Sequence, residues 1–350
     1  MGEVTRPYYF LVTVWGRQFS DYLVHYCIPS LLSAGNIPAL PGRSRFIVAC
    51  PEIDWKYISE SRSAMRLQLY ADLEWIPFDV TPGGNAHRMM GEAHLLLTRR
   101  AFDDMAYGVL LTPDFILADG SMEFVDGKRR EGYRVVLTCA LRSEEEALFQ
   151  AMVDRGVNIA HGISRRDLAW CAVRANHSET QCYEWLTGYF AKSPSAVWWR
   201  MPEDQMLIYS LSWNPIFFDY SALQSHDDSV MREWTIDGDY VYKNFGDDPR
   251  LIYVCRDSDE VLEVSWSPKA DRPRTMSKNS HWKSYTPEGY EEFEKVKARW
   301  LTTFYYSDSF EPLKRRIFFG PVRWHFEDCG EEWDRVEDQC TKYLHEILDL

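Results

Sequence analysis

The sequence predicts an α/β protein in which a mainly parallel sheet is flanked by helices. Short apolar and β-branched runs, such as residues 8–14 and 45–50, end at turn-forming residues, as buried parallel strands do. Stretches with apolar residues at helical spacing separate these runs, and repeated alternation of strand and helix is typical of parallel sheets with helices on both faces. The C-terminal half is less regular, and we expect an irregular α+β arrangement there.

Composition indicates a chain that is folded nearly throughout. Its 350 residues are 45% hydrophobic and 15% aromatic, far from the composition of disordered chains. This length exceeds the usual single-domain size of ~100 to 150 residues. We expect an N-terminal α/β half, residues 1–142, and a second half, residues 143–350, packed on it as one continuous globular unit.

The charge balance argues against a nucleic-acid partner. The chain has 39 Lys and Arg against 53 Asp and Glu, a net charge of -14, whereas binding to phosphate backbones needs a positive field. Two basic triplets, residues 128–130 and 314–316, are candidate anchors for peripheral membrane contact, although solvated loop charge is the favoured interpretation.

Cysteine usage favours a reducing compartment. The eight cysteines are scattered without a C-x-x-C pair, which suits reduced core thiols and excludes a recognisable zinc motif. The N-terminal residues lack the features of a signal peptide, and no apolar run approaches the ~20 residues of a transmembrane helix. We therefore predict a soluble, cytoplasmic protein.

The stretch 107–122 carries the first candidate site. An apolar run over residues 109–111 ends at Pro113 and Asp114, and a second run leads to Asp119 and Gly120. Open α/β sheets bind ligands outside the carboxyl ends of their strands, so Asp114 is expected at a ligand crevice, with Asp119 a secondary candidate. A polar turn is the alternative for each. Neither a dinucleotide fingerprint nor a P-loop is present.

The helices before and after this stretch are predicted from caps and periodicity. One is expected from Ser20, with a kink at Pro29, and another after Gly83-Gly84-Asn85. His87 and His94 share a face of the second helix, so they could line the crevice, although a surface role is favoured.

The second half carries two acidic clusters and many aromatic residues. Asp237 and Asp239 flank a glycine, and the run Asp257-Ser258-Asp259-Glu260 follows an apolar stretch over residues 251–254. Clustered carboxylates stay ionised only where a cation or donors compensate them, and hard oxygen ligands select Mg²⁺ or Mn²⁺. A solvated acidic turn is the alternative for both. Short strands in 198–218 suggest an antiparallel extension whose aromatic side chains either shape a pocket or pack in the core.

The first ~125 residues resemble the nucleotide-sugar half of GT-A fold glycosyltransferases. The residues that carry the resemblance are a helix end matching the family's "SLL" pattern (27–32), an acidic turn at Glu52 and Asp54, and the strand end Leu111-Thr112-Pro113-Asp114. The resemblance implies a GT-A-like, Rossmann-like core. It also implies a donor site at Trp15, Gly16, Glu52, Arg88 and Asp114, where the aspartate holds a divalent metal bridging the donor diphosphate. The segments VTVWG (12–16) and DSDE (257–260) also resemble a group of uncharacterised bacterial proteins, which implies no activity.

The chain departs from the family pattern in two places. Thr112 stands where a full D-x-D motif has its first aspartate, and the turn at Trp15-Gly16-Arg17 lacks the family's Pro-x-Tyr-Asn pattern. Part of the metal chemistry is therefore expected at Asp257 and Asp259. His281 is a candidate third ligand, because GT-A enzymes sometimes use a C-terminal histidine.

The sequence thus predicts a glycosyltransferase that moves a sugar from a nucleotide-sugar donor to a glycan or other hydroxyl acceptor with Mn²⁺ or Mg²⁺. Asp259 or Glu260 is the candidate general base, because the acceptor hydroxyl must lose its proton as it attacks. One alternative is a non-catalytic module that binds a glycan or a protein, since a fold does not fix a function. Another is a metal-dependent nucleotidyltransferase.

Overall fold

The structure is a computed structural model that describes residues 6–187, 190–269, 287–307 and 310–350, and it confirms a mixed α/β fold. A seven-stranded main sheet has the order β11-β6-β10-β4-β1-β2-β3. In that order the strands are β11 (Ile252–Val254), β6 (Val135–Thr138), β10 (Asn214–Asp219), β4 (Tyr107–Leu111), β1 (Tyr8–Thr13), β2 (Ser44–Cys50) and β3 (Ala71–Pro77).

The main sheet is parallel except at β10. Strands β4, β1, β2 and β3 pair in parallel, as do β6 and β11, while β10 runs antiparallel between β4 and β6. Asn214, the first residue of β10, therefore lies at the edge of the sheet where β4 and β6 end. Because β10 and β11 follow residue 142 in the chain, strands from the second half complete the sheet.

Helices cover both faces of the main sheet. All six residues of β1 are buried; Tyr9 and Leu11 face the cluster that contains α5, while Phe10 and Val12 face the one that contains α2 and α6. The helices are α1 (Arg17–Tyr22), α2 (Ile28–Leu31), α3 (Glu52–Ser59), α4 (Arg62–Leu67), α5 (Ala86–Asp103), α6 (Ser121–Arg130), α7 (Glu145–Arg155), α8 (Arg165–Arg174), α9 (Ser178–Gln181), α10 (Gly238–Phe245), α11 (Pro287–Tyr305), α12 (Glu311–Phe318) and α13 (Glu331–Leu348). A strand buried on both faces explains why β1 reads as a continuous apolar run.

The helix expected from Ser20 begins earlier and widens into a π-helical turn before Pro29. It starts at Arg17 after Gly16, whose φ of 81° favours glycine, so the prediction of Ser20 as its N-cap was wrong. A π-helical turn, Leu23–Cys27, then joins α1 to α2. Pro29 has no N–H to donate, and the wider π-helical turn directly precedes it. The kink at Pro29 stays a prediction.

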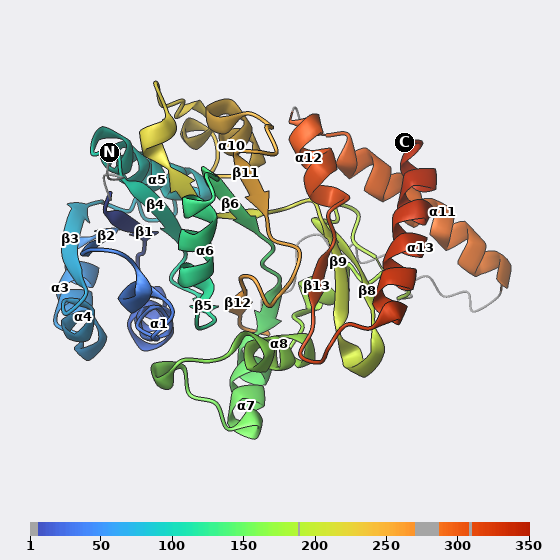
Figure 1. The fold of residues 1–350 in the computed structure, drawn as a ribbon, viewed down its shortest axis with the longest axis horizontal. Helices are drawn as coiled ribbons and strands as arrows, with labels where there is room; N and C mark the ends of the chain where they lie inside the picture. The colour runs from blue at the N-terminus through green and yellow to red at the C-terminus, as the bar shows by residue number, and fades with distance from the viewer. Residues whose placement is uncertain (1–5, 188–189, 270–286, 308–309) are drawn as a thin grey trace.

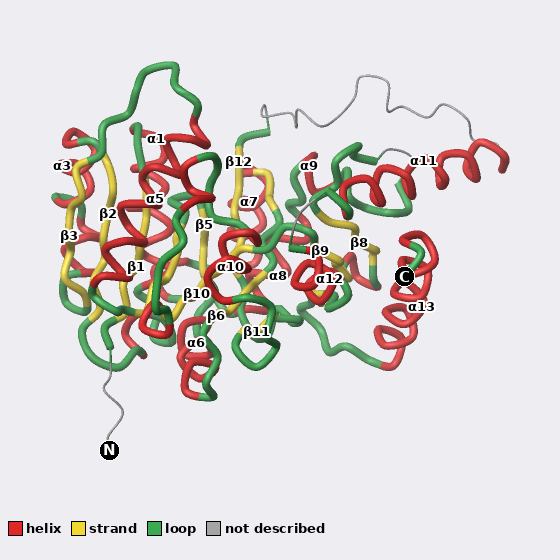
Figure 2. The backbone as a smooth tube through the Cα atoms, turned by 90° about the horizontal axis from the view of Figure 1, so that it is seen from above, coloured by secondary structure: helices red, strands yellow, loops and turns green. Residues whose placement is uncertain are grey.

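Two small sheets extend the molecule beyond the main sheet. One contains β5 (Phe115–Leu117), β12 (Glu263–Ser267) and β7 (Arg142–Glu144); the other is the antiparallel set β13 (Val322–Trp324), β9 (Met206–Ser210) and β8 (Ala196–Arg200). Together β8, β9, α11 and α13 form a separate hydrophobic cluster. Figures 1 and 2 show these four elements at one end of the long axis of the molecule, opposite the end where β3 lies.

The structure also describes the basic triplets, the cysteines and the apolar character of the helices. Lys314 is 1% exposed and Arg129 is 6% exposed, so neither basic triplet presents three charges to solvent. The eight cysteines are all free thiols. Within the described residues, no helix combines the length and the apolar character needed to cross a membrane.

Candidate functional site

A cleft of about 570 Å³ opens at the carboxyl edge of the main sheet. It begins where β1 and β4 end, at Thr13 and Leu111, and is closed on other sides by α5, by β12 and by the segment 234–237. Asp114 lies in its wall, as its place after β4 predicted. The rule that ligands bind outside the carboxyl ends of parallel strands therefore makes this cleft the first candidate site.

Glu263 of β12 is the most unusual acid in the cleft. It is 1% exposed, and its Oε1 accepts a hydrogen bond of 2.5 Å from Nδ2 of Asn214. Its buried Oε2 has no hydrogen-bond partner in the described structure. Burial raises the pKa of Glu263 from 4.5 to about 7, against the opposing effect of the Asn214 hydrogen bond. A carboxyl group of this kind can exchange a proton near neutral pH.

Asp114 faces the only Lys or Arg among the described residues that line the cleft. Asp114 is half-buried, and burial raises the pKa of its carboxyl group, while the positive charge of Arg142 and a hydrogen bond with Thr112 oppose the rise. Arg142 also lies 3.3 Å from Oε2 of Glu179, in a small polar pocket that shares Arg142, Ser212 and Ser265 with the cleft. Near the end of β4, the cleft thus offers a ligand the carboxylate of Asp114 and the guanidinium of Arg142.

Helix α5 and the segment 231–234 form an aromatic wall. The ring of His87 stacks on Trp234 with centroids 4.4 Å apart, and both residues line the cleft. The close approach depends on Gly91, because a Cβ there would lie 2.2 Å from the carbonyl oxygen of Trp234 and 2.4 Å from that of Met231. Trp15 and Trp213 line other parts of the cleft. Aromatic faces of this kind suit a planar base or a sugar ring.

His94, seven residues after His87 on the same face of α5, also lines the cleft. It is 3% exposed, and its Nδ1 has no hydrogen-bond partner among the described residues. Burial lowers the pKa of His94 to about 4, so the imidazole is neutral at pH 7. The favoured surface role was wrong for His94, which is buried, whereas His87 is exposed and also lines the cleft. His94 offers a ligand one neutral ring nitrogen.

The residues predicted to hold a donor divide into two groups. Trp15 and Asp114 line the cleft, and Gly16 forms the turn after Trp15, where its N–H donates to Oδ2 of Asp54 at 3.0 Å. Glu52 is exposed in the first turn of α3, and Arg88 is exposed on α5, where it pairs with Glu92. Neither Glu52 nor Arg88 is among the described residues that line the cleft.

The secondary candidates have structural partners. Asp119 Oδ1 accepts a hydrogen bond of 2.7 Å from the Gly35 N–H. Asp237 caps α10, accepting from the N–H of Asp239 at 3.0 Å, and it also lines the cleft. Asp239 is in the first turn of α10, where a negative charge suits the helix dipole. The bend predicted at these residues is thus the start of a helix.

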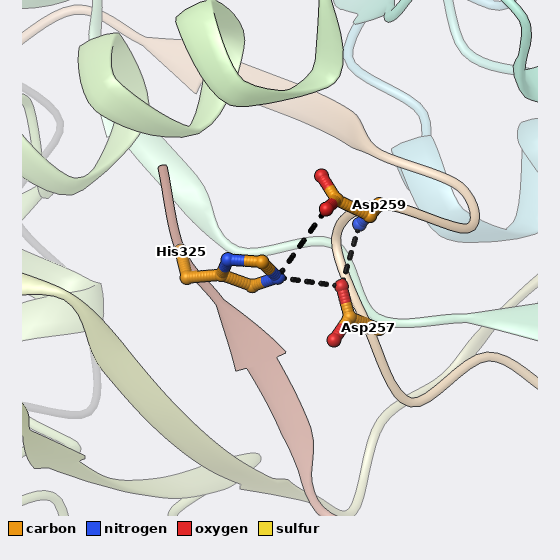
Figure 3. A group of neighbouring side chains, drawn as sticks. All are labelled: Asp257, Asp259 and His325. Atoms are coloured by element: carbon orange, nitrogen blue, oxygen red, sulfur yellow. Dashed lines mark hydrogen bonds and ion pairs between the residues drawn. The ribbon is translucent and has the colours of Figure 1, made fainter. Parts of the chain in front are cut away.

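Asp257 and Asp259 meet a histidine that the sequence did not predict. One ligand atom each of Asp257, Asp259 and His325 lies within 4.8 Å of the others, and Figure 3 shows the three side chains pointing toward one another from the β11–β12 loop and the end of β13. We call this group the triad. His325 Nε2 lies 2.7 Å from Asp257 Oδ1 and 3.8 Å from Asp259 Oδ2. None of the three is among the described residues that line the cleft.

The remaining predicted residues are Glu260 and His281. Glu260 accepts hydrogen bonds from the Tyr253 hydroxyl at 2.5 Å and from the Arg256 N–H at 2.8 Å, so its carboxylate closes the loop after β11. His281 lies outside the described residues.

Comparisons with known proteins give no family for this chain. No protein-family model matches it, and no curated protein has significant similarity to it. A function for this protein therefore has to be inferred from the geometry of the cleft and of the triad.

Glu263 and His325 are the two functional candidates that sequence reasoning missed. Glu263 is a single acid inside the apolar run 261–266, and a charged residue in a buried strand was the signal available. His325 stands in an aromatic stretch about 65 residues after Asp259, and nothing local pairs them. Only the pairing of the β11–β12 loop with β13 brings these side chains together.

Proposed function

We propose that this protein is a glycosyltransferase that moves a sugar from a nucleotide-sugar donor to an acceptor hydroxyl in the cleft. One observation carries the proposal. The cleft at the strand ends holds Asp114 on one side and, on another, the buried Glu263, whose Oε2 has no hydrogen-bond partner in the described structure. The order of strand, helix and strand leading to Asp114 agrees with the GT-A-like arrangement that the N-terminal residues resemble. Trp15, Trp213 and Trp234 supply aromatic faces for a base or a sugar.

Asp114 fits a cation that arrives with the donor. No group of three metal-ligating side chains forms around Asp114 in the described residues, so phosphate oxygens of the donor would have to complete the coordination of a cation there. Mg²⁺ and similar ions are commonly bound by one or two carboxylates together with substrate phosphates. A Mg²⁺ or Mn²⁺ held by Asp114 would neutralise charge on the leaving diphosphate. Arg142, which acts electrostatically on Asp114, places a second positive charge on the same side.

Glu263 is the general base in this proposal, in place of Asp259 or Glu260. In a direct displacement the acceptor oxygen bonds to the anomeric carbon, the bond from that carbon to the diphosphate oxygen breaks, and the hydroxyl proton passes to a base. Glu263 Oε2 is free to take that proton because Asn214 holds only Oε1. Asp259 is held by Arg166, and Glu260 is held by Tyr253, away from the cleft-lining residues.

A thermal-shift screen of nucleoside diphosphates with and without Mn²⁺ tests the proposal. The parent protein is expected to be stabilised by UDP or GDP in a Mn²⁺-dependent way and to transfer or hydrolyse a matching sugar nucleotide, and Asp114→Asn is expected to lose the nucleotide response. No response to any nucleotide would contradict the proposal and favour a binding module. Turnover of nucleoside triphosphates would indicate a nucleotidyltransferase instead.

A further inference from the structure

We propose that Asp257, Asp259 and His325 form a second metal site, specific for a divalent transition metal such as Zn²⁺ or Mn²⁺ and separate from the cleft. The site would join the β11–β12 loop to the residue that directly follows β13. It does not depend on the proposed function, since none of its residues is among the described residues that line the cleft.

The orientation of His325 is the first argument. Its Nδ1 lies 2.7 Å from the carbonyl oxygen of Glu327, which only accepts hydrogen bonds, so Nδ1 carries the hydrogen. Nε2 then points at Asp257 Oδ1, another acceptor, at 2.7 Å. Two acceptors can face each other at that distance only with a proton or a metal ion between them. A ring whose Nδ1–H donates to a backbone carbonyl while Nε2 is free for a cation is the usual arrangement of a metal-bound histidine.

Charge balance is the second argument. Arg166 donates to Asp259 Oδ2 at 2.9 Å and also pairs with Asp328 at 2.8 Å. With a neutral His325, the carboxylates of Asp257, Asp259 and Asp328 and the Arg166 guanidinium leave two negative charges among these side chains, and Arg165 adds a further positive charge that acts on Asp259. A divalent cation cancels the two negative charges, whereas one proton on the imidazole cancels half.

The loop is also fixed in the position that such a site needs. The Ser258 N–H donates to the Arg323 carbonyl at 2.8 Å, and the His325 N–H donates to Oγ of the buried Ser258 at 3.1 Å. These bonds hold the backbone on both sides of the ligands. Asp257 and Asp259 are 32% and 38% exposed at their side chains, so small rotations can bring their oxygens into one coordination sphere.

The ligand set defines the class of metal. Imidazole nitrogen favours Zn²⁺ and other transition metals over Mg²⁺ and Ca²⁺, and carboxylates also accept Mn²⁺. Three protein ligands leave a position for water, as in zinc sites with His and carboxylate ligands. This refines the expectation of Mg²⁺ or Mn²⁺ that Asp257 and Asp259 alone suggested, because His325 adds a nitrogen ligand.

Isothermal titration of the full chain with MnCl₂, ZnCl₂ and MgCl₂, without nucleotide, tests the site. We expect one Mn²⁺ or Zn²⁺ per chain, with Mg²⁺ weaker, and binding at least tenfold weaker in Asp257→Asn and His325→Gln. The control Asp248→Asn removes a partly exposed carboxylate that pairs with the exposed Arg250, and it should bind metal as the parent does.

Further variants separate this site from other causes. Asp114→Asn should leave nucleotide-free metal binding unchanged, so failure here and failure of the proposed function are distinguishable. If His325→Gln does not fold, metal binding by Asp259→Asn tests the site instead. The Asp259 side chain is 38% exposed, so its substitution should leave the fold intact. Cys329→Ser tests for a thiol site in the same segment and should retain Zn²⁺ binding. The proposal is overturned if the parent binds neither Zn²⁺ nor Mn²⁺, if the triad variants bind as the parent does, or if Cys329→Ser abolishes binding.

Discussion

The two places where this chain gathers carboxylates differ in how their negative charge is compensated. In the cleft, Glu263 is 1% exposed with one oxygen held by Asn214 and the other without a partner in the described structure. In the triad, Asp259 is 38% exposed and is held by Arg166, with His325 3.8 Å away. The first arrangement raises the pKa of the carboxyl group to about 7, so its ionised form can accept a proton near neutral pH. The second favours ionised carboxylates that need a cation.

This difference assigns separate tasks to residues that the sequence grouped together. Asp114, Asp257 and Asp259 were all candidate metal ligands, with the choice between Asp114 and the 257–260 cluster left open, and the structure places Asp114 in the cleft and the other two with His325. Burial without a partner is the property expected of an acid–base group, and convergence of charged ligands is the property expected of a metal site. Substitutions at Glu263, Gly91 and Arg166 test this division, with expected effects that decrease in that order.

The largest effect is expected from Glu263→Gln on sugar transfer. Glutamine keeps the shape and the contact with Asn214 but cannot accept a proton, so the transfer rate should fall by about 10²- to 10⁴-fold. Nucleotide binding should remain, as measured by thermal shift. Steady-state rates of Glu263→Gln and Glu260→Gln, compared side by side, decide between the two acids, and a loss confined to Glu260→Gln would show that the base lies outside the cleft.

The same substitution should change how stability depends on pH. The folded-state pKa of Glu263 is about 7 and its ordinary value is 4.5, so the folded chain binds more protons between these pH values. The contribution of Glu263 to the free energy of unfolding is therefore fully present at low pH and is lost as the pH rises toward 7. Relative to the parent, Glu263→Gln should gain about 2 to 3 kcal/mol in free energy of unfolding between pH 5 and pH 8. Urea unfolding at both pH values measures this, and a constant difference would argue against a buried neutral carboxyl group.

A smaller effect is expected from Gly91→Ala in the aromatic wall. The added methyl group would lie 2.2 Å from the Trp234 carbonyl oxygen, so the segment 231–234 must move away from α5. Overpacking of this kind costs about 1 to 3 kcal/mol, and moving Trp234 should also weaken nucleotide binding.

Gly127→Ala is the matched control for Gly91→Ala. It lies in α6, where an added Cβ meets nothing within 4 Å in the described part of the chain, and should be neutral or slightly stabilising. Equal melting temperatures for the two alanine variants would contradict the packing argument.

The smallest effect concerns Arg166. Its guanidinium is 43% exposed and competes with a cation for Asp259, so Arg166→Gln should tighten Mn²⁺ binding at the triad by a few fold. Weaker Mn²⁺ binding in this variant, measured by isothermal titration, would mean that Arg166 orders Asp259 for the metal instead of competing with it.

The sequence predicted those parts of the fold that depend on local pattern. The buried strands β1 and β2, the N-cap at Asn85 and the acid after β4 all follow from residues close together in the chain. Contacts between distant segments were not predictable in this way. The insertion of β10 against the direction of its neighbours brings Asn214 to Glu263, and β13 brings His325 to the DSDE loop. The helix α10 was also missed, because its capping Asp237 has the same local sequence as an acidic bend.

The division between cleft and triad is tested most directly by the affinity of a nucleoside diphosphate, in the presence of Mn²⁺, for the parent, Asp114→Asn and Asp257→Asn. We predict that Asp114→Asn weakens nucleotide binding at least tenfold, because it removes the protein's carboxylate from the cation that accompanies the diphosphate, while Asp257→Asn binds the nucleotide as the parent does. Loss of nucleotide binding in Asp257→Asn with retention in Asp114→Asn would contradict this account and place the donor at the triad.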